Sequence, residues 1–200
     1  MEEQKPITIA AFDFDGTITQ TDSMFGFVRY VSGKWRYRLG LIWFGPLFIK
    51  YRYKWITPHR AKEVFLSHYL GGKTDEELKT LGEKFSREII PKILRPKAIE
   101  KLRWHQQEGH RCFVVTASMA YWIKPWALEN GLEFVGTRHE VANGVFTGKI
   151  DGKNCAGPEK VNRLLEILGN QEIEKSYAYG DTSGDKEMLE WADEGGYRCF

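Results

Sequence analysis

The sequence predicts an α/β protein, in which a parallel sheet with helices on both faces forms the core and an all-helical cap is inserted. Outside positions 22–91, short apolar runs typical of buried strands alternate with helical patterns, as at 7–14 and 111–116. This alternation is typical of a parallel sheet covered on both sides. Within 22–91, helix signals follow one another without an intervening strand. We therefore expect a core of residues 1–21 and 92–200 and a cap of residues 22–91.

Capping and turn residues mark the boundaries of individual elements. In chain order, these signals are a helix start at Asp22-Ser23, a break at Gly45-Pro46, a helix start at Thr57-Pro58, a capping box from Thr74 to Glu77, and a type I′ hairpin turn at Asn143-Gly144. Further helices are expected over 96–109, 120–129 and 158–169, with strands over 132–135 and 176–180.

Composition excludes several classes of protein. The 200 residues are 42% hydrophobic and 28% charged, which is ordinary for a globular domain with an insertion. The three cysteines are widely scattered without CxxC spacing, so we expect no zinc site and no disulfide framework. The N-terminal run carries acids and then enters a strand, unlike a signal peptide. These features favour a cytoplasmic protein.

Two pairs of aspartates follow predicted strands. Asp13 and Asp15 end the first strand, and Asp181 and Asp185 follow the strand near 176–180. Because ligands of parallel sheets bind at the carboxyl ends of strands, these carboxylates can converge. Carboxylates, phosphate oxygens and water are the ligands that Mg²⁺ prefers. Taken singly, the first pair could be a satisfied loop turn and Asp185 a helix N-terminal acid, but together they predict a Mg²⁺ site.

Other residues complete the predicted phosphoryl-transfer site. Thr116-Ala117-Ser118 lies where the second strand is expected to enter a helix, and its hydroxyls and backbone amides can bind an anion there. Gly16 and Thr17 add a sharp turn and a hydroxyl beside the first pair. Lys160 lies in the first turn of its helix, where a cation gains nothing from the helix dipole. We expect Asp13 to attack phosphorus, Lys160 to screen charge, and Asp15 to protonate the leaving oxygen.

These residues resemble the four motifs of the haloacid dehalogenase superfamily. Residues 13–19, DFDGTIT, match the phosphatase form of motif one, Thr116 resembles motif two, Lys160 resembles motif three, and Gly180-Asp181 through Asp185 resemble motif four. The resemblance implies a Rossmann-like core. It also implies Mg²⁺ bound by Asp13, Asp181 and the backbone carbonyl of Asp15, with Asp185 supporting the site. Lys153 is a competing candidate for motif three.

The insertion resembles the helical cap of the phosphoserine-phosphatase-like branch, subfamily IB. The resemblance implies a phosphomonoesterase whose cap gates access and selects a small phosphoserine-like ester or a lipid phosphate. Asp22 stands where phosphoserine phosphatases use a longer Glu to read the substrate amine, so the substrate does not carry over with the chemistry. Two alternatives are a phosphoacceptor signalling domain and a membrane-associated binding protein with weak catalysis.

The cap is strongly basic and aromatic. Residues 23–62 contain nine basic residues and no Asp or Glu, while the whole chain has a net charge of +2. The uncharged run 39–49 is too short to cross a bilayer. It is flanked by Arg36, Arg38, Lys50, Arg52 and Lys54. Its aromatics could pack on one another, touch a membrane peripherally or bind a polyanion, but no nucleic-acid module is recognisable, so none is expected as a partner.

Overall fold

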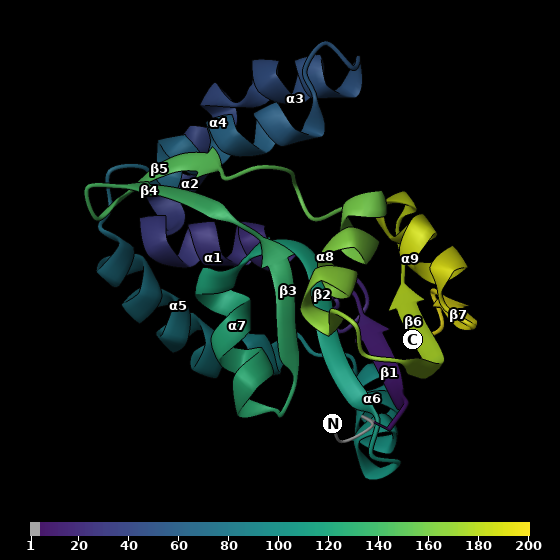
Figure 1. Cartoon of the computed structure of the whole chain (residues 1–200). Coiled ribbons are helices and arrows are strands. Elements are labelled where there is room, and N and C mark those ends of the chain that lie inside the picture. The colour runs from purple at the N-terminus through teal and green to yellow at the C-terminus, as the bar shows by residue number, and fades with distance from the viewer. Residues whose placement is uncertain (1–4) are drawn as a thin grey trace.

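The computed structural model describes residues 5–200, except for the side chains of Leu47, Phe48, Lys50 and Tyr51. Of the basic residues expected to flank the uncharged run of the cap, Lys50 therefore lies outside the described side chains, as do the aromatic residues Phe48 and Tyr51. The core is a five-stranded parallel sheet (Figure 1). Its strand order is β3 (Glu133–Thr137), β2 (Arg111–Met119), β1 (Ile7–Phe12), β6 (Ile173–Gly180) and β7 (Glu194–Tyr197).

Helices cover both faces of this sheet, because successive strand residues point to opposite sides. In β1, Ala10 and Phe12 face one buried cluster, whereas Ile9 and Ala11 face the other. The first cluster includes side chains of α6 (Pro96–Gln107) and α7 (Ala120–Glu129), and the second includes side chains of α8 (Pro158–Leu168) and α9 (Lys186–Trp191). The α/β class and its helix-covered parallel sheet are confirmed.

The insertion between β1 and β2 is helical. Its helices are α1 (Ser23–Ser32), α2 (Lys34–Trp43), α3 (Gly45–Arg52), α4 (Pro58–Leu70) and α5 (Asp75–Glu88). The predicted capping signals hold, since the Asp22 side chain accepts bonds from the Met24 and Phe25 amides and Thr74 forms the reciprocal box with Glu77. The chain also breaks between α2 and α3, next to Gly45-Pro46.

Some boundaries differ from those predicted. β1 ends at Phe12, before Asp13, and β2 runs past Thr116 to Met119. The strand β7 was not anticipated, because its sequence EGGY contains two glycines and little apolar pattern. The hairpin of β4 (His139–Ala142) and β5 (Val145–Ile150) is confirmed, with positive φ at Asn143 (51°) and Gly144 (76°), as a type I′ turn requires.

The insertion is anchored to the core at two places. The Glu63 carboxylate of α4 accepts a bond from the Ile150 amide of the hairpin at 3.1 Å. Helix α5 lies so close to α7 that a Cβ on Gly82 would stand 1.9 Å from the Tyr121 carbonyl oxygen. The hairpin at 139–150 thus packs with the helices of 22–91, although it was assigned to the core. The division into 1–21 with 92–200 and 22–91 remains a prediction.

We predict that Gly82→Ala lowers the free energy of unfolding by about 2 kcal/mol or more, because overpacking against backbone outweighs the gain in helix propensity. Chemical denaturation monitored by circular dichroism measures this change. Gly45→Ala is the matched control, since no atom lies within 4 Å of a Cβ built there. A Gly82→Ala variant as stable as this control would contradict the close packing of α5 on α7.

Candidate active site

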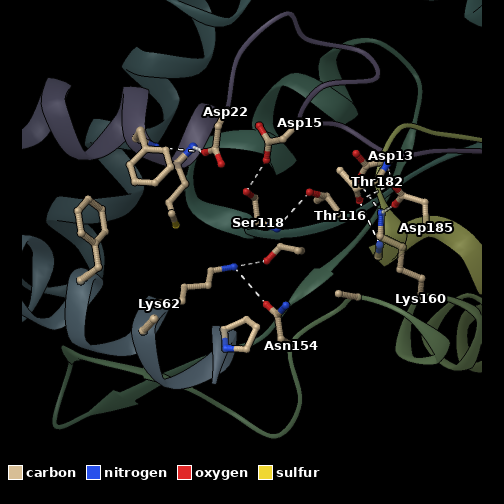
Figure 2. Close-up of a pocket in the computed structure, with 18 residues that line it drawn as sticks. Asp13, Asp15, Asp22, Lys62, Thr116, Ser118, Asn154, Lys160, Thr182 and Asp185 are labelled. Atoms are coloured by element: carbon tan, nitrogen blue, oxygen red, sulfur yellow. Dashed lines mark hydrogen bonds and ion pairs between the residues drawn. The ribbon is translucent and has the colours of Figure 1, made fainter. Parts of the chain in front are cut away.

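Asp13, which follows β1, and Asp185, which follows β6, meet at the carboxyl end of the sheet (Figure 2). The Asp13 amide donates to the Tyr179 carbonyl of β6 at 2.8 Å, which aligns the ends of the two central strands. Ligand oxygens of Asp13, Asp181 and Asp185 lie within 4.8 Å of one another. The predicted convergence of these three residues is therefore present in the structure.

Lys160 lies beneath this trio and is almost fully buried. Its ammonium donates to Oδ1 of Asp13 at 2.5 Å, to Oδ1 of Asp185 at 2.5 Å and to the Val115 carbonyl at 2.7 Å, so all three N–H donors are used. Burial lowers the pKa of Lys160, but the two carboxylates more than offset this, and the net pKa is raised. The competing Lys153 is exposed. The geometry therefore favours Lys160 for motif three.

Burial also acts on the aspartates. Asp13 is 6% exposed, and its pKa is raised to about 7 by desolvation and by the Asp185 and Asp15 charges, against the lowering effect of Lys160. Burial tends to raise the pKa of Asp185 as well, yet Lys160 and Thr182 hold the net pKa below its usual value. A site that desolvates carboxylates in this way favours the arrival of a further cation.

Asp185 also builds the turn that carries Asp181. Its Oδ2 accepts bonds from the Asp181 amide at 3.1 Å, the Thr182 amide at 2.9 Å and the Thr182 hydroxyl at 2.9 Å. On the facing loop, Thr17 donates to Oδ1 of Asp181 at 3.1 Å. Gly16 has a φ of 91°, and a Cβ there would lie 2.4 Å from Oδ2 of Asp181, so glycine is required.

The Asp15 carboxylate lies apart from the trio. Its Oδ1 accepts a bond from the Ser23 amide at 2.6 Å, and its Oδ2 accepts one from the Ser118 hydroxyl at 2.6 Å. The expectation that the side chains of all four aspartates surround one point is therefore wrong for Asp15. Two donors from separate elements hold its carboxylate toward the cavity instead (Figure 2).

The residues after Val115 form the neighbouring part of the site. The Thr116 hydroxyl accepts a bond from the Ser118 amide at 3.0 Å, and Thr116, Ala117 and Ser118 all line the cavity. The Ala117 carbonyl is occupied by the Thr137 hydroxyl at 2.5 Å. The predicted anion-binding residues therefore border the same space as Asp13 and Lys160, although they lie in the last part of β2 and not at the start of α7.

These groups border a cavity of about 430 Å³ that lies between the sheet and the insertion. Its floor is polar and charged, with Asp13, Asp15, Thr116, Lys160 and Asp185. Its opposite wall comes from α1 and α4 and is largely apolar, with Met24, Phe25, Pro58, Ala61 and Phe65. Such a site suits a ligand with a charged end and a less polar remainder.

Asp22 and Lys62 stand on the insertion side of the cavity. Asp22 keeps substantial solvent exposure, but the surrounding walls and the Asp15 charge raise its pKa to about 6. Lys62 donates to the Ala117 carbonyl at 2.5 Å and to Oδ1 of Asn154 at 3.2 Å. Burial lowers the pKa of Lys62 to about 8, although Asp15 and Asp22 oppose that effect. The structure thus places a cation on the insertion side of the cavity.

Sequence reasoning missed both Lys62 and Asn154. Lys62 is one of nine basic residues between positions 23 and 62, and no local pattern distinguishes it from the other eight. Asn154 lies in a polar loop without a recognisable pattern, so no signal was present there either.

We predict that Lys160→Met lowers the free energy of unfolding by about 3–5 kcal/mol, because two carboxylates lose their buried counter-charge. Urea denaturation without added metal measures the loss. Lys153→Met, at an exposed lysine of the same region, should stay within about 0.5 kcal/mol of the unaltered chain. Equal effects of the two substitutions would contradict the burial and pairing of Lys160.

Comparison with known proteins agrees with this geometry. The sequence profile of the haloacid dehalogenase-like hydrolases matches residues 10–190. Protein CicA of Caulobacter vibrioides is 36% identical over 194 residues, covering 96% of this chain and 86% of its own. Phosphoserine phosphatase SerB1 of Mycobacterium tuberculosis is 27% identical over 201 residues, covering 94% of this chain and 64% of its own.

A solved structure of similar fold is a protein of unknown function from Bordetella pertussis Tohama I. It has a TM-score of 0.81 and 26% identity, and the match covers 94% of this chain and 88% of that one. The profile match spans most of the chain, including all four motifs. The chain therefore belongs to the haloacid dehalogenase-like hydrolase family, which confirms the resemblance seen in its motifs and the expectation of a phosphatase-type enzyme.

Proposed function

We propose that the chain is a Mg²⁺-dependent phosphomonoesterase that acts through an aspartyl-phosphate on Asp13. The observation that carries this proposal is the meeting of Asp13, Asp181 and Asp185 beside a cavity that Asp13, Asp15 and Asp185 line, with Lys160 paired to Asp13 and Asp185. The resemblance of residues 13–19 to the phosphatase form of motif one supports the same chemistry.

The acidic trio fits a hard divalent cation. Three carboxylates against one ammonium leave two formal negative charges, and their oxygens lie close enough for one ion. Oxygen donors are the ligands that Mg²⁺ selects. Asp13 and Asp181 would hold the ion with the Asp15 backbone carbonyl, and Asp185 would support them. When bound, Mg²⁺ supplies charge neutralisation for the transferring phosphoryl group.

The remaining steps can be assigned to the residues of this chain. An Asp13 oxygen forms a bond to phosphorus while the ester P–O bond breaks, and Asp15 donates a proton to the departing oxygen. Asp15 then removes a proton from the water that attacks the acyl-phosphate, which releases inorganic phosphate and restores Asp13. Thr116, Ala117 and Ser118 near the end of β2, with Gly16 and Thr17, would hold the phosphoryl oxygens, and the buried charge of Lys160 would offset their negative charge.

The residues of the cavity wall indicate which class of phosphate ester fits the site. A relative with 27% identity is named a phosphoserine phosphatase, which supports a small phosphoserine-like ester. The aromatic wall and the shorter acid Asp22 suit a less polar leaving group, such as that of a lipid phosphate. Lys62 can still donate one N–H to an oxygen on that group. Rates on phosphoserine, sugar phosphates, nucleotides and a lysolipid phosphate separate these classes.

The phosphoacceptor alternative is less well supported. A signalling domain needs a long-lived aspartyl-phosphate and an accessible surface, whereas here the Asp15 carboxylate is held in the cavity and the insertion covers the site. An acyl-phosphate lifetime of minutes would favour signalling over hydrolysis.

We predict that Asp13→Asn lowers Mg²⁺-dependent hydrolysis of an aryl phosphate by at least about a thousandfold, because the amide cannot replace the nucleophile. Phosphate release is measured with Mg²⁺ and with a chelator. Asp151→Asn, at an exposed aspartate outside the cavity, is the control and should keep full activity. Undiminished turnover by Asp13→Asn would refute the mechanism.

Asp15→Asn should slow alkyl esters far more than activated aryl esters. An alkoxide leaves poorly without a proton, so losses of about 10²–10⁴-fold are expected for alkyl phosphates. A nitrophenolate leaves without protonation, so the first step on its ester should be nearly unaffected in single-turnover measurements of phenolate release. Equal losses on both esters would argue against Asp15 as the leaving-group acid.

A further inference from the structure

Helix α2 turns an apolar stripe toward solvent. Trp35, Leu39, Ile42 and Trp43 are 77%, 62%, 75% and 84% exposed, respectively. Their spacing of four, seven and eight residues places them on one side of the helix. A helix on the surface of a globular domain ordinarily buries such a stripe against its core. Here the stripe is available for contact with something outside the chain.

Packing against α4 on the opposite side of α2 holds the helix in this orientation. Gly40 is buried against Tyr69 of α4, where a Cβ would stand 1.9 Å from the Tyr69 hydroxyl oxygen. That hydroxyl donates to the Tyr37 carbonyl at 2.9 Å. Rotating α2 to bury its outer stripe would break this contact, so the exposure follows from the packing of the helix.

The exposed surface continues past α2, and it is cationic. Ile49 is 56% exposed on α3. We call the surface formed by Trp35, Leu39, Ile42, Trp43 and Ile49 the α2–α3 face. Helix α3 lies at the top of Figure 1, away from the core sheet. Five exposed cations surround it: Lys34, Arg36, Arg38, Arg52 and Lys54.

These cations have no internal counter-charge. Residues 23–62 contain no Asp or Glu. Among the described side chains, no carboxylate lies within salt-bridge distance of any of the five. The Arg38 guanidinium lies 5.9 Å from the Trp35 ring centroid, so a cation and an apolar ring share one surface. Apolar rings interleaved with unpaired cations are complementary to the boundary between lipid tails and anionic headgroups.

A layer of packed aromatic rings lies between the α2–α3 face and the cavity. Phe44, between α2 and α3, contacts Phe65 with ring centroids 5.5 Å apart, and Phe65 contacts Phe25 at 5.3 Å. Phe65 and Phe25 belong to the apolar wall of the cavity. The same aromatic layer therefore separates the exposed face from the charged floor of the site.

We propose that the α2–α3 face docks onto a lipid bilayer that carries anionic headgroups. No helix in the described part of the chain has the length and hydropathy to cross a bilayer, so the contact is one of lying on the surface. A second copy of the chain is a poorer occupant, because its face would bring the same unpaired cations together. This docking does not require that the site hydrolyse phosphate esters.

The test is flotation of the purified chain with phosphatidylcholine vesicles and with vesicles containing about 30% phosphatidylglycerol. We expect binding to the anionic vesicles alone. Trp35→Ser with Trp43→Ser should weaken it at least about tenfold through lost apolar insertion. Arg36→Gln with Arg38→Gln should weaken it about fivefold for each cation removed. The matched controls, Leu128→Ser and Lys84→Gln with Lys97→Gln, should bind as the unaltered chain does.

Circular dichroism and hydrolysis of a soluble aryl phosphate show that the variants remain folded. If the unaltered chain hydrolyses no ester yet floats with anionic vesicles, the proposed function fails and the docking stands. Absence of flotation, or equal flotation of the tryptophan variant, overturns the docking. So does a dimer in sedimentation that Trp35→Ser with Trp43→Ser dissociates, or preferential binding of single-stranded RNA over anionic vesicles.

Discussion

The site depends on the pairing of one buried ammonium with two buried carboxylates. Lys160 reaches Asp13 from β1, Asp185 from the loop after β6 and the Val115 carbonyl from β2. Each of these groups would be costly to bury alone, and their attraction holds the ends of three neighbouring strands in register. The same ammonium offsets one of the three formal negative charges of the acidic trio and leaves the other two, which is the basis of the cation site proposed above.

Much of this arrangement could be predicted from the sequence, because parallel strands impose it. Once Asp13, Thr116 and Asp181 are placed at or near the carboxyl ends of buried strands, the parallel topology brings them to one edge of the sheet. Lys160 was harder to assign, because it and Lys153 lie near each other in the chain. Burial distinguishes them, and burial depends on how α8 packs against the sheet.

Other features needed the three-dimensional structure. The direction of the Asp15 carboxylate is set by Ser23 and Ser118, which belong to distant segments and leave no local signature. Lys62 and Asn154 meet only because α4 and the 151–157 loop approach across the cavity. Strand β7 was missed because its two glycines weaken the local sequence pattern that predicts a strand. Its pairing with β6 stabilises it instead.

The anchoring of the insertion constrains how a substrate reaches the floor of the cavity. Besides the approach of Gly82 to Tyr121, the Tyr121 hydroxyl donates to Asp75 at 2.7 Å, and the Trp122 indole donates to Ser23 at 2.8 Å. Both ends of the helical insertion are thus fastened to α7. A rigid lid swinging away from the sheet would have to break these bonds together. For the proposed hydrolysis of phosphate esters, selectivity would then depend on the fixed walls that α1 and α4 contribute to the cavity.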